Sequence, residues 1–427
     1  MTTATRRPSV AGALGFVLLT VLVAVLAWQA STRSVDFPVY HRVARQVLSG
    51  NFQVYPNDVY SAHGGSPHGF RYLPVVALLF APFGLLPLPL SAFLFFMIKL
   101  AVLAWMGTAV GRQAGLPNGW RGPLIALLVV AGYLAEELRY GNAHALVIGL
   151  MVFAWMRAAR GERWWPGTAL ALAVAMKITP IALVGYWLLR RQVAVSLATL
   201  AMIAALMFAP VPIVGMEMNT HLLTGFGLYA LEKTEESDNY SLRGALERVF
   251  SMPTLEDLRR GRLQSDAERA AARTADRRAI MSWLALSALL GLAAMVVLWR
   301  RSSDVHVQLL DFAIVLTLML IVSPHTQRRY FMQLYVPMIA LLPLASGSDR
   351  RTRHLARLGL AVTFAAGTLL PAVFGGRTLS RLYESATPYA WAAVVLLLAL
   401  FALRVTLERR AQRENRSSRT GAKAFAN

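Results

Sequence analysis

The stretch Ser34-Val-Asp-Phe-Pro-Val-Tyr-His-Arg-Val-Ala-Arg-Gln-Val-Leu-Ser-Gly50 lies between the first and the second long apolar runs of the chain. Its valines recur every four residues, at positions 39, 43 and 47, and Arg42, Arg45 and Gln46 fall on the other side. This spacing predicts a short helix with one apolar face and one cationic face, which is typical of a helix that lies in the membrane interface.

Asp36 is the one carboxylate of this stretch and stands just before the predicted helix. A side chain in that place normally accepts a hydrogen bond from the first turn of the backbone. Tyr40 follows one turn later on the same face. Two interpretations remain open: Asp36 is an ordinary helix cap, or it is a carboxylate held at the edge of the bilayer for chemistry.

The composition predicts a polytopic, all-helical membrane protein. Of the 427 residues, 56% are hydrophobic and 15% are charged, with several apolar runs of near-spanning length. The net charge of +21 does not indicate nucleic-acid binding, because the cations cluster at the ends of the apolar runs, as the positive-inside rule describes. The chain has no cysteine, which excludes disulfides, a thiolate nucleophile and a cysteine zinc site.

Twelve apolar runs approach the length of a membrane span. They cover residues 11–27, 73–88, 90–110, 123–135, 143–156, 164–189, 193–214, 280–299, 307–322, 331–345, 358–374 and 389–403. The first follows Arg6 and Arg7 and has no clear cleavage site, so we interpret it as an uncleaved helix rather than a signal peptide. We expect one membrane-embedded domain over residues 1–427.

The arginine clusters orient the predicted spans. Both termini, including a basic tail at 404–427, are expected in the cytoplasm, and the loops 31–72, 215–278 and 323–330 outside. The run 164–189 resists strict alternation because arginines flank it and because Lys177 and Pro180 stand in its middle. It is predicted to be a broken helix or two half-helices, and a re-entrant segment at 123–135 would restore the alternation.

Charged groups at membrane depth are costly and need a partner or a function. Lys177 is the deepest candidate, either binding an anionic group such as a phosphate or reaching out to the interface. His325, Arg328 and Arg329 share one predicted outer turn, where they form either a phosphate clamp or a contact with lipid phosphates. Arg243, in the large outer loop, follows Asn239-Tyr-Ser-Leu and precedes a helix-like run, and this segment by itself is interpreted as a turn.

Other polar residues receive weaker predictions. Arg71 and Tyr72 lead into the second run, where a tyrosine is typical of the aromatic belt but an outer arginine is less so. Asp58, His63, Glu136 and Glu137 are interpreted as structural or solvated, and Asp311 is placed near the cytoplasmic end of its run, away from an outer site. No Walker motif, dinucleotide glycine motif or metal-ligand histidine spacing occurs, so we expect neither an ATP-driven pump nor a zinc enzyme.

Six short motifs occur in an order that resembles glycosyltransferase family 87. They are Asp36-Phe-Pro-Val-Tyr40, Phe70-Arg-Tyr-Leu-Pro74, Arg139-Tyr-Gly-Asn142, Lys177-Ile-Thr-Pro180 followed by Arg190-Arg191, Asn239-Tyr-Ser241 with Arg243, and Ser323-Pro-His325. Each motif is short, and the resemblance rests on their order and spacing relative to the apolar runs. Gly141-Asn-Ala-His144 departs from the Gly-Gln-x-Asn that is usual in that family.

The resemblance implies the membrane-embedded GT-C fold and a polyprenyl-phosphate mannose donor. It implies that Asp36 is the catalytic base. The donor phosphate would be held by Lys177, His325, Arg328, Arg329 and Arg243. The substrates would contact Tyr40, Arg71, Tyr72, Asn142, His144 and Asn239.

The expected reaction is a single displacement with inversion, in which Asp36 removes the proton of an acceptor hydroxyl on a lipid or glycan. We expect no metal and no cofactor, an extracytoplasmic site on the bacterial inner membrane, and no nucleic-acid partner. Mannose is the expected sugar, with arabinofuranose as the alternative. A lipid or sugar transporter or flippase, and an O-antigen-ligase-like glycan transferase, remain as alternative functions.

Overall fold

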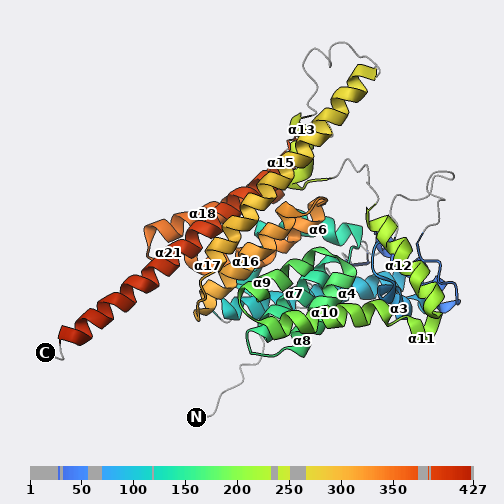
Figure 1. Cartoon of the computed structure of the whole chain (residues 1–427), viewed down its shortest axis with the longest axis horizontal. Coiled ribbons are helices and arrows are strands. Elements are labelled where there is room, and N and C mark those ends of the chain that lie inside the picture. Colours follow the sequence, from blue (N-terminus) through green and yellow to red (C-terminus); the bar gives the residue numbers. More distant parts are fainter. Residues whose placement is uncertain are drawn as a thin grey trace, which may run out of the picture. The chain divides into compact units, whose positions relative to one another are not determined.

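A computed structural model describes residues 27–28, 32–55, 70–117, 120–231, 239–250, 266–373, 383 and 386–424 (Figure 1). All regular structure in these residues is helical, as the composition predicted. The chain divides into two compact units. The first comprises residues 1–101, 138–143 and 207–231, and the second comprises residues 102–137, 144–206 and 232–427.

The helices of the first unit are α2 (Phe37–Leu48), α3 (Pro74–Gly84), α11 (Val211–Val214) and α12 (Met216–Leu231). Residues of both units occur in α4 (Leu88–Gln113), α6 (Ala131–Tyr140) and α10 (Val193–Phe208). The second unit contains α5 (Arg121–Val129), α7 (His144–Ala158), α8 (Trp164–Met176), η1 (Thr179–Ile181), α9 (Ala182–Leu189), α13 (Leu242–Phe250), α15 (Asp266–Leu298), α16 (Val305–Val322), η2 (Arg328–Leu334), α17 (Tyr335–Ala345), α18 (Arg350–Phe364), η3 (Ala365–Leu369), α19 (Leu370–Val373) and α21 (Pro388–Ala424).

Five helical segments in the described residues are long and apolar enough to cross a membrane, and each coincides with a predicted span. They are Leu88–Gln113, Val193–Val214, Arg277–Leu298, Val305–Val322 and Pro388–Arg410. Four shorter apolar helices, Pro74–Gly84, His144–Ala158, Trp164–Met176 and Thr179–Leu189, coincide with further predicted runs. The predicted run 11–27 lies almost wholly outside the described residues. The predicted number of twelve spans is therefore not established.

The outer surfaces of these helices are apolar. In Arg277–Leu298 only 6% of the most apolar stretch is buried within the protein, and in Val193–Val214 only 17%. Met281, Leu289 and Val296 of α15 are all more than 60% exposed. An apolar surface of this extent would be an aggregation site in water, whereas a bilayer solvates it. The chain is therefore a membrane protein.

The predicted break in the run 164–189 is confirmed. Helix α8 ends at Met176, Lys177 adopts an extended conformation with φ −159° and ψ 127°, and the chain resumes helically in η1 and α9. Pro180 explains the break, because it has no N–H to donate to the carbonyl oxygen of Met176, four residues earlier, and its ring would clash with that carbonyl in a continuous helix. Lys177 consequently lies at a helix end rather than within a continuous span.

An aromatic cluster forms the core of the first unit. Phe37 and Tyr40 of α2, Phe80 and Phe83 of α3, and Phe95 of α4 pack together with ring centroids 4.9 to 6.3 Å apart. Helices α2 and α3 approach closely at Gly84 of α3, where a Cβ would lie 2.9 Å from the backbone of Ala44 in α2. Such a core holds the beginning of α2 rigidly, because edge-to-face and tilted ring pairs add directional contacts to apolar burial.

A buried ion-pair network joins four segments of the second unit. Asp311 of α16 is 0% exposed and accepts hydrogen bonds from Arg190, after α9, and from Nε of Arg404, in α21, at 2.7 Å. Both arginines also donate to the carbonyl oxygen of Arg300, at 3.0 and 2.7 Å. Glu408 extends the network by accepting from Arg404 at 2.9 Å and from Arg300 at 3.2 Å.

Two predicted polar segments are helical in the structure. The predicted basic tail, residues 404–427, begins within helix α21. Its first residue, Arg404, is 1% exposed and belongs to the ion-pair network. The end of the predicted loop 215–278 is helical from Asp266 onward and continues into the eighth apolar run as one helix, α15. Figure 1 draws both α15 and α21 as long single helices.

Replacing Asp311 with alanine should destabilise the protein by about 3–5 kcal/mol, because two buried guanidinium groups lose their counter-charge. Thermal unfolding in detergent measures the effect. The matched control is Glu162→Ala, which removes a surface pair with Arg157 at 3.1 Å and should cost less than about 1 kcal/mol. Equal losses in the two variants would contradict a structural role for the Asp311 network.

Candidate active site

Asp36 is the N-cap residue of α2, but its side chain makes no capping hydrogen bond. The sequence explains this. Pro38 has no N–H to donate, and the N–H of Val39 bonds the carbonyl oxygen of Asp36 at 3.0 Å. The carboxylate instead accepts a hydrogen bond from Nδ2 of Asn142 at 2.7 Å. Since Asp36 is only 6% exposed, the first interpretation, an ordinary cap, does not describe it.

The turn that carries Asn142 requires glycine. Gly141 has φ +67°, and a Cβ on it would lie 2.7 Å from the Cβ of Ser34. The preceding residue, Tyr140, accepts backbone hydrogen bonds from Val35 at 3.1 Å and from Asp36 at 2.7 Å. The segment before α2 and the turn 140–142 are thus fastened to each other directly beside the carboxylate.

Lys99 of α4 supports this turn. The sequence patterns did not single it out. It is 0% exposed within α4, and its Nζ donates to the carbonyl oxygen of Asn142 at 2.9 Å. The Phe95 ring lies 5.7 Å from the same ammonium group. The signal that could have found Lys99 is its place as the one lysine in the apolar run 90–110, since a lysine at membrane depth needs a partner.

The predicted substrate residues Tyr40 and Tyr72 also lie in the first unit and are bonded to each other. Their hydroxyl oxygens are 2.6 Å apart, and their rings are tilted with centroids 5.4 Å apart. Arg71, beside Tyr72, is half-buried in the segment that leads into α3. On α2 itself, Val39, Tyr40 and Val43 are buried and Arg42 and Arg45 are exposed, as the spacing predicted, whereas Gln46 and Val47 are both half-buried. The position of this helix in the membrane interface stays a prediction.

A second polar group, in the second unit, forms around Tyr330. The ammonium of Lys177 lies 3.0 Å from the centroid of the Tyr330 ring, a cation–π contact. His144 lies with Nε2 3.2 Å from the Tyr330 carbonyl oxygen and donates to it, and the two rings are 4.9 Å apart. Arg329 is buried and holds its guanidinium 5.4 Å from the same ring. The structure therefore brings Lys177, Arg329 and His144 together.

Two carboxylates of α6 accompany this group. Glu136 pairs with Nε of Arg328 at 3.1 Å, and the guanidinium of Arg328 also lies 5.3 Å from the Tyr389 ring. Glu137 is 0% exposed and accepts a hydrogen bond from the backbone of Ala145 at 3.2 Å, in the first turn of α7. Both carboxylates are bonded within the protein rather than solvated, and Arg328 is an ion-paired cation.

Asn239 fastens the predicted turn around His325 to the segment before α13. Its Nδ2 donates to the carbonyl oxygen of Pro324 at 3.0 Å, and its Oδ1 accepts from the backbone of Thr326 at 3.1 Å. The next residue, Tyr240, donates from its backbone to Thr326 at 2.6 Å. Two predicted motifs that are distant in sequence therefore meet, and Asn239 shapes the turn that carries the half-buried His325.

Arg243 stands apart from the Tyr330 group in its bonding. Its Nε donates to Glu247 at 2.7 Å, one turn along α13. No cluster of three or more His, Asp or Glu side chains suited to a metal ion occurs in the described parts of the chain.

The family model for glycosyltransferase family 87 matches residues 70–324, which is more than half of the chain. The chain belongs to glycosyltransferase family 87. The match includes Asn142, Lys177 and Asn239, and it ends one residue before His325. Asp36 lies before it.

Three curated relatives carry names that describe polyprenol-phosphate-mannose-dependent mannosyltransferases. The chain is 28% identical to the alpha-(1-2)-phosphatidylinositol mannoside mannosyltransferase of Mycolicibacterium smegmatis, over 39% of this chain and 41% of the relative. It is 25% identical to the enzyme of the same name from Mycobacterium tuberculosis, over 47% and 52%. It is 30% identical to the M. smegmatis phosphatidylinositol pentamannoside mannosyltransferase, over 43% and 45%. The chain spans about half the length of the curated relatives it matches.

Gly141→Ala should destabilise this family 87 protein more than Gly161→Ala. Both glycines have positive φ, +67° and +81°, so both alanines pay about 1–2 kcal/mol for a left-handed backbone. Only Gly141 is crowded, by Ser34 and Phe37, whereas nothing lies within 4 Å of a Cβ on Gly161. We expect a further loss of about 1–3 kcal/mol for Gly141→Ala in thermal unfolding. Equal losses of thermal stability in the two variants would show that the turn 140–142 shifts easily to accommodate a Cβ.

Proposed function

We propose that the chain transfers mannose from a polyprenyl-phosphate donor to a glycolipid acceptor by a single displacement with inversion. The observation that carries the proposal is the buried carboxylate of Asp36, which makes no capping hydrogen bond and instead accepts one from Asn142. The proposal combines this with the membership in glycosyltransferase family 87 and with the donor and acceptor that the relatives' names state. Arabinofuranose is the alternative sugar.

Asp36 would act as the general base. It would accept the proton of the acceptor hydroxyl as that oxygen attacks the anomeric carbon opposite the phosphate. The hydrogen bond from Asn142 to Oδ2 supports this role, because it orients the carboxylate without protonating it. Within the described residues of the first unit, the other carboxylate is the exposed Glu217 of α12, so this unit offers no buried pair for a double displacement.

Lys99 would be a positioning residue for this base. It touches no substrate in the proposal, but it holds the carbonyl oxygen of Asn142, and Asn142 in turn holds Asp36. Tyr40 and Tyr72, joined through their hydroxyl groups, would contact the sugar or the acceptor together with Arg71.

The group around Tyr330 would stabilise the leaving phosphate. Negative charge builds up on a phosphate as the glycosidic bond breaks, and fixed cations that are already desolvated stabilise it most. Lys177 and Arg329 converge there on one ring, and His325 stands on the adjoining turn. Arg328 would contribute less because Glu136 already neutralises part of its charge, and Arg243 would contribute least because it bonds Glu247.

The proposed reaction needs no metal and no cofactor. Its leaving group is a phosphate monoester of a polyprenol, and the cations of the Tyr330 group would carry out the charge neutralisation that a divalent ion performs in other phosphate chemistry. The donor is a substrate rather than a resident group.

We place the reaction at the outer face of the bacterial inner membrane, within one GT-C-type domain of about twelve spans. The arginines at 300–301 and 350–357 support a cytoplasmic assignment of that end of the second unit. The exposed Arg42 and Arg45 of α2 support a helix whose cationic face lies along the membrane interface in the loop 31–72. The loop 215–278 would also be extracytoplasmic.

A transporter or flippase is the second candidate, and the break at Lys177 is the observation that favours it. Interrupted helices with a polar residue at the break are typical of transporter binding sites. That function gives no role to the oriented carboxylate of Asp36. An O-antigen-ligase-like transfer of a whole glycan would use the same base but a diphosphate donor.

Asp36→Asn should lower transfer by about two to four orders of magnitude while leaving thermal stability close to that of the wild type, because an amide cannot accept the proton. The assay uses the full chain in detergent with polyprenyl-phosphate-mannose and a phosphatidylinositol mannoside, and it follows release of polyprenyl phosphate. The matched control is Asp304→Asn, at an exposed N-cap where the carboxylate accepts from His306 at 2.8 Å. An Asp36→Asn variant with near-normal turnover would refute the general-base role.

Lys177→Met and His325→Ala should each reduce kcat by about tenfold or more, because charge-assisted contacts contribute about 1.5–3 kcal/mol each. The controls are Arg243→Gln and His354→Ala. Arg243 bonds Glu247, and His354 is exposed on α18, so we expect less than about threefold change in either control. If Arg243→Gln were the most damaging variant, the donor phosphate would bind near α13 rather than at the Tyr330 group.

A further inference from the structure

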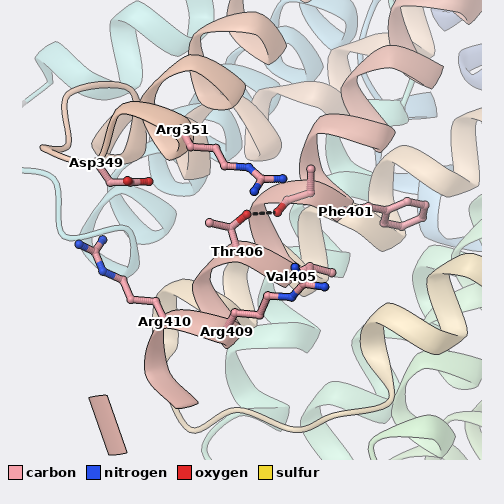
Figure 2. Close-up of a pocket in the computed structure, with 8 residues that line it drawn as sticks. Asp349, Arg351, Phe401, Val405, Thr406, Arg409 and Arg410 are labelled. Atoms are coloured by element: carbon pink, nitrogen blue, oxygen red, sulfur yellow. Dashed lines mark hydrogen bonds between the residues drawn. The ribbon is translucent and has the colours of Figure 1, made fainter. Parts of the chain in front are cut away.

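A crevice of about 540 Å³ lies between α18 and α21, in the second unit, and the catalytic proposal does not use it. Three arginines line it: Arg351 from the first turn of α18, and Arg409 and Arg410 from α21. All three side chains are exposed. Figure 2 shows Arg351 reaching from α18 toward the face of α21 that carries Thr406.

The crevice is apolar at one end and cationic at the other. Phe401, Ala402 and Val405 line it along α21 before the two arginines. At a rise of 1.5 Å per residue, the nine steps from Phe401 to Arg410 correspond to about 13 Å along the helix axis. The apolar segment of α21 that is suited to cross a membrane ends at Arg410. The crevice therefore lies where the apolar segment ends, at the depth of lipid headgroups.

The charge of the crevice is positive. Asp349 is its one carboxylate among the lining residues, so three arginines and one aspartate leave a net charge of +2. Asp349 already accepts a hydrogen bond from the backbone of Thr352 at 2.8 Å, as the N-cap of α18. Hydrogen bonding from Thr352, with Arg410 and Arg351 nearby, lowers the pKa of Asp349.

We propose that this crevice binds the phosphate headgroup of an anionic membrane lipid. The phosphate would lie among Arg351, Arg409 and Arg410, and the glycerol and the first acyl carbons would cover Phe401, Ala402 and Val405. Guanidinium groups bind phosphate oxygens with two parallel hydrogen bonds, and basic pockets between membrane helices on the cytoplasmic side bind such headgroups. A free phosphate shares the headgroup's charge but would leave the apolar end uncovered.

The test measures binding of dioctanoyl phosphatidylglycerol to the full chain in a nonionic detergent, by native mass spectrometry. The double variant Arg351→Gln/Arg409→Gln should bind about 25-fold more weakly than the wild type, since each arginine near an anionic headgroup contributes about fivefold. The control variant Arg350→Gln/Arg112→Gln removes the same charge from two exposed arginines outside the crevice, and it should stay within about twofold of the wild type.

Two further ligands identify what the crevice recognises. Dioctanoyl phosphatidylcholine should bind far more weakly than phosphatidylglycerol, and inorganic phosphate should not compete at millimolar concentration. Equal losses in the two double variants, equal affinity for the two lipids, or full competition by inorganic phosphate would each overturn the lipid site. Thermal unfolding confirms that the variants are folded, and if the double variant were unfolded, the single Arg409→Gln variant with its expected fivefold loss provides the same test.

Discussion

The buried carboxylate of Asp311 is the constraint on which the second unit depends. A guanidinium group in a membrane protein cannot remain buried without a counter-charge, and here two of them share one aspartate. Because Arg190 follows α9, Asp311 belongs to α16 and Arg404 belongs to α21, their pairing fixes three helices that are far apart in sequence. The carbonyl oxygen of Arg300, bonded by both arginines, adds the connection between α15 and α16.

The first unit also contains a buried charged side chain that is held by a hydrogen-bond partner. Lys99 is fully buried and gives its ammonium group to the carbonyl oxygen of Asn142, whose side chain then holds Asp36. The two units differ in the partners that the carboxylates bond. Asp311 accepts hydrogen bonds from two guanidinium groups, whereas Asp36 accepts one from the side-chain amide of Asn142. In the proposed mechanism this amide orients the carboxylate toward the acceptor hydroxyl.

The sequence predicted the features that local chemistry determines. Pro180 and Lys177 predicted the break between α8 and α9, and the valine spacing predicted the two faces of α2. Lys99 and Arg404 were missed because their partners lie 43 and 93 residues away, a distance that periodicity does not report. The number of spans stays a prediction, because runs such as 331–345 divide between a 3₁₀ segment, η2, and the helix α17, and neither piece is long enough by itself to identify a span.

The same ion-pair network bears on the choice between enzyme and transporter. Alternating access requires the two halves of an interrupted helix, or the bundles that carry them, to move against their neighbours. Here α9, which follows the break at Lys177, is anchored at its end because Arg190 bonds both Asp311 and the carbonyl oxygen of Arg300. Moving α9 away would leave buried charges uncompensated, at a cost of about 3–5 kcal/mol. A site that must keep Lys177 fixed against a developing phosphate charge benefits from this anchoring, because preorganised cations stabilise a transition state without reorganisation. The rigidity that would hinder transport therefore favours transfer.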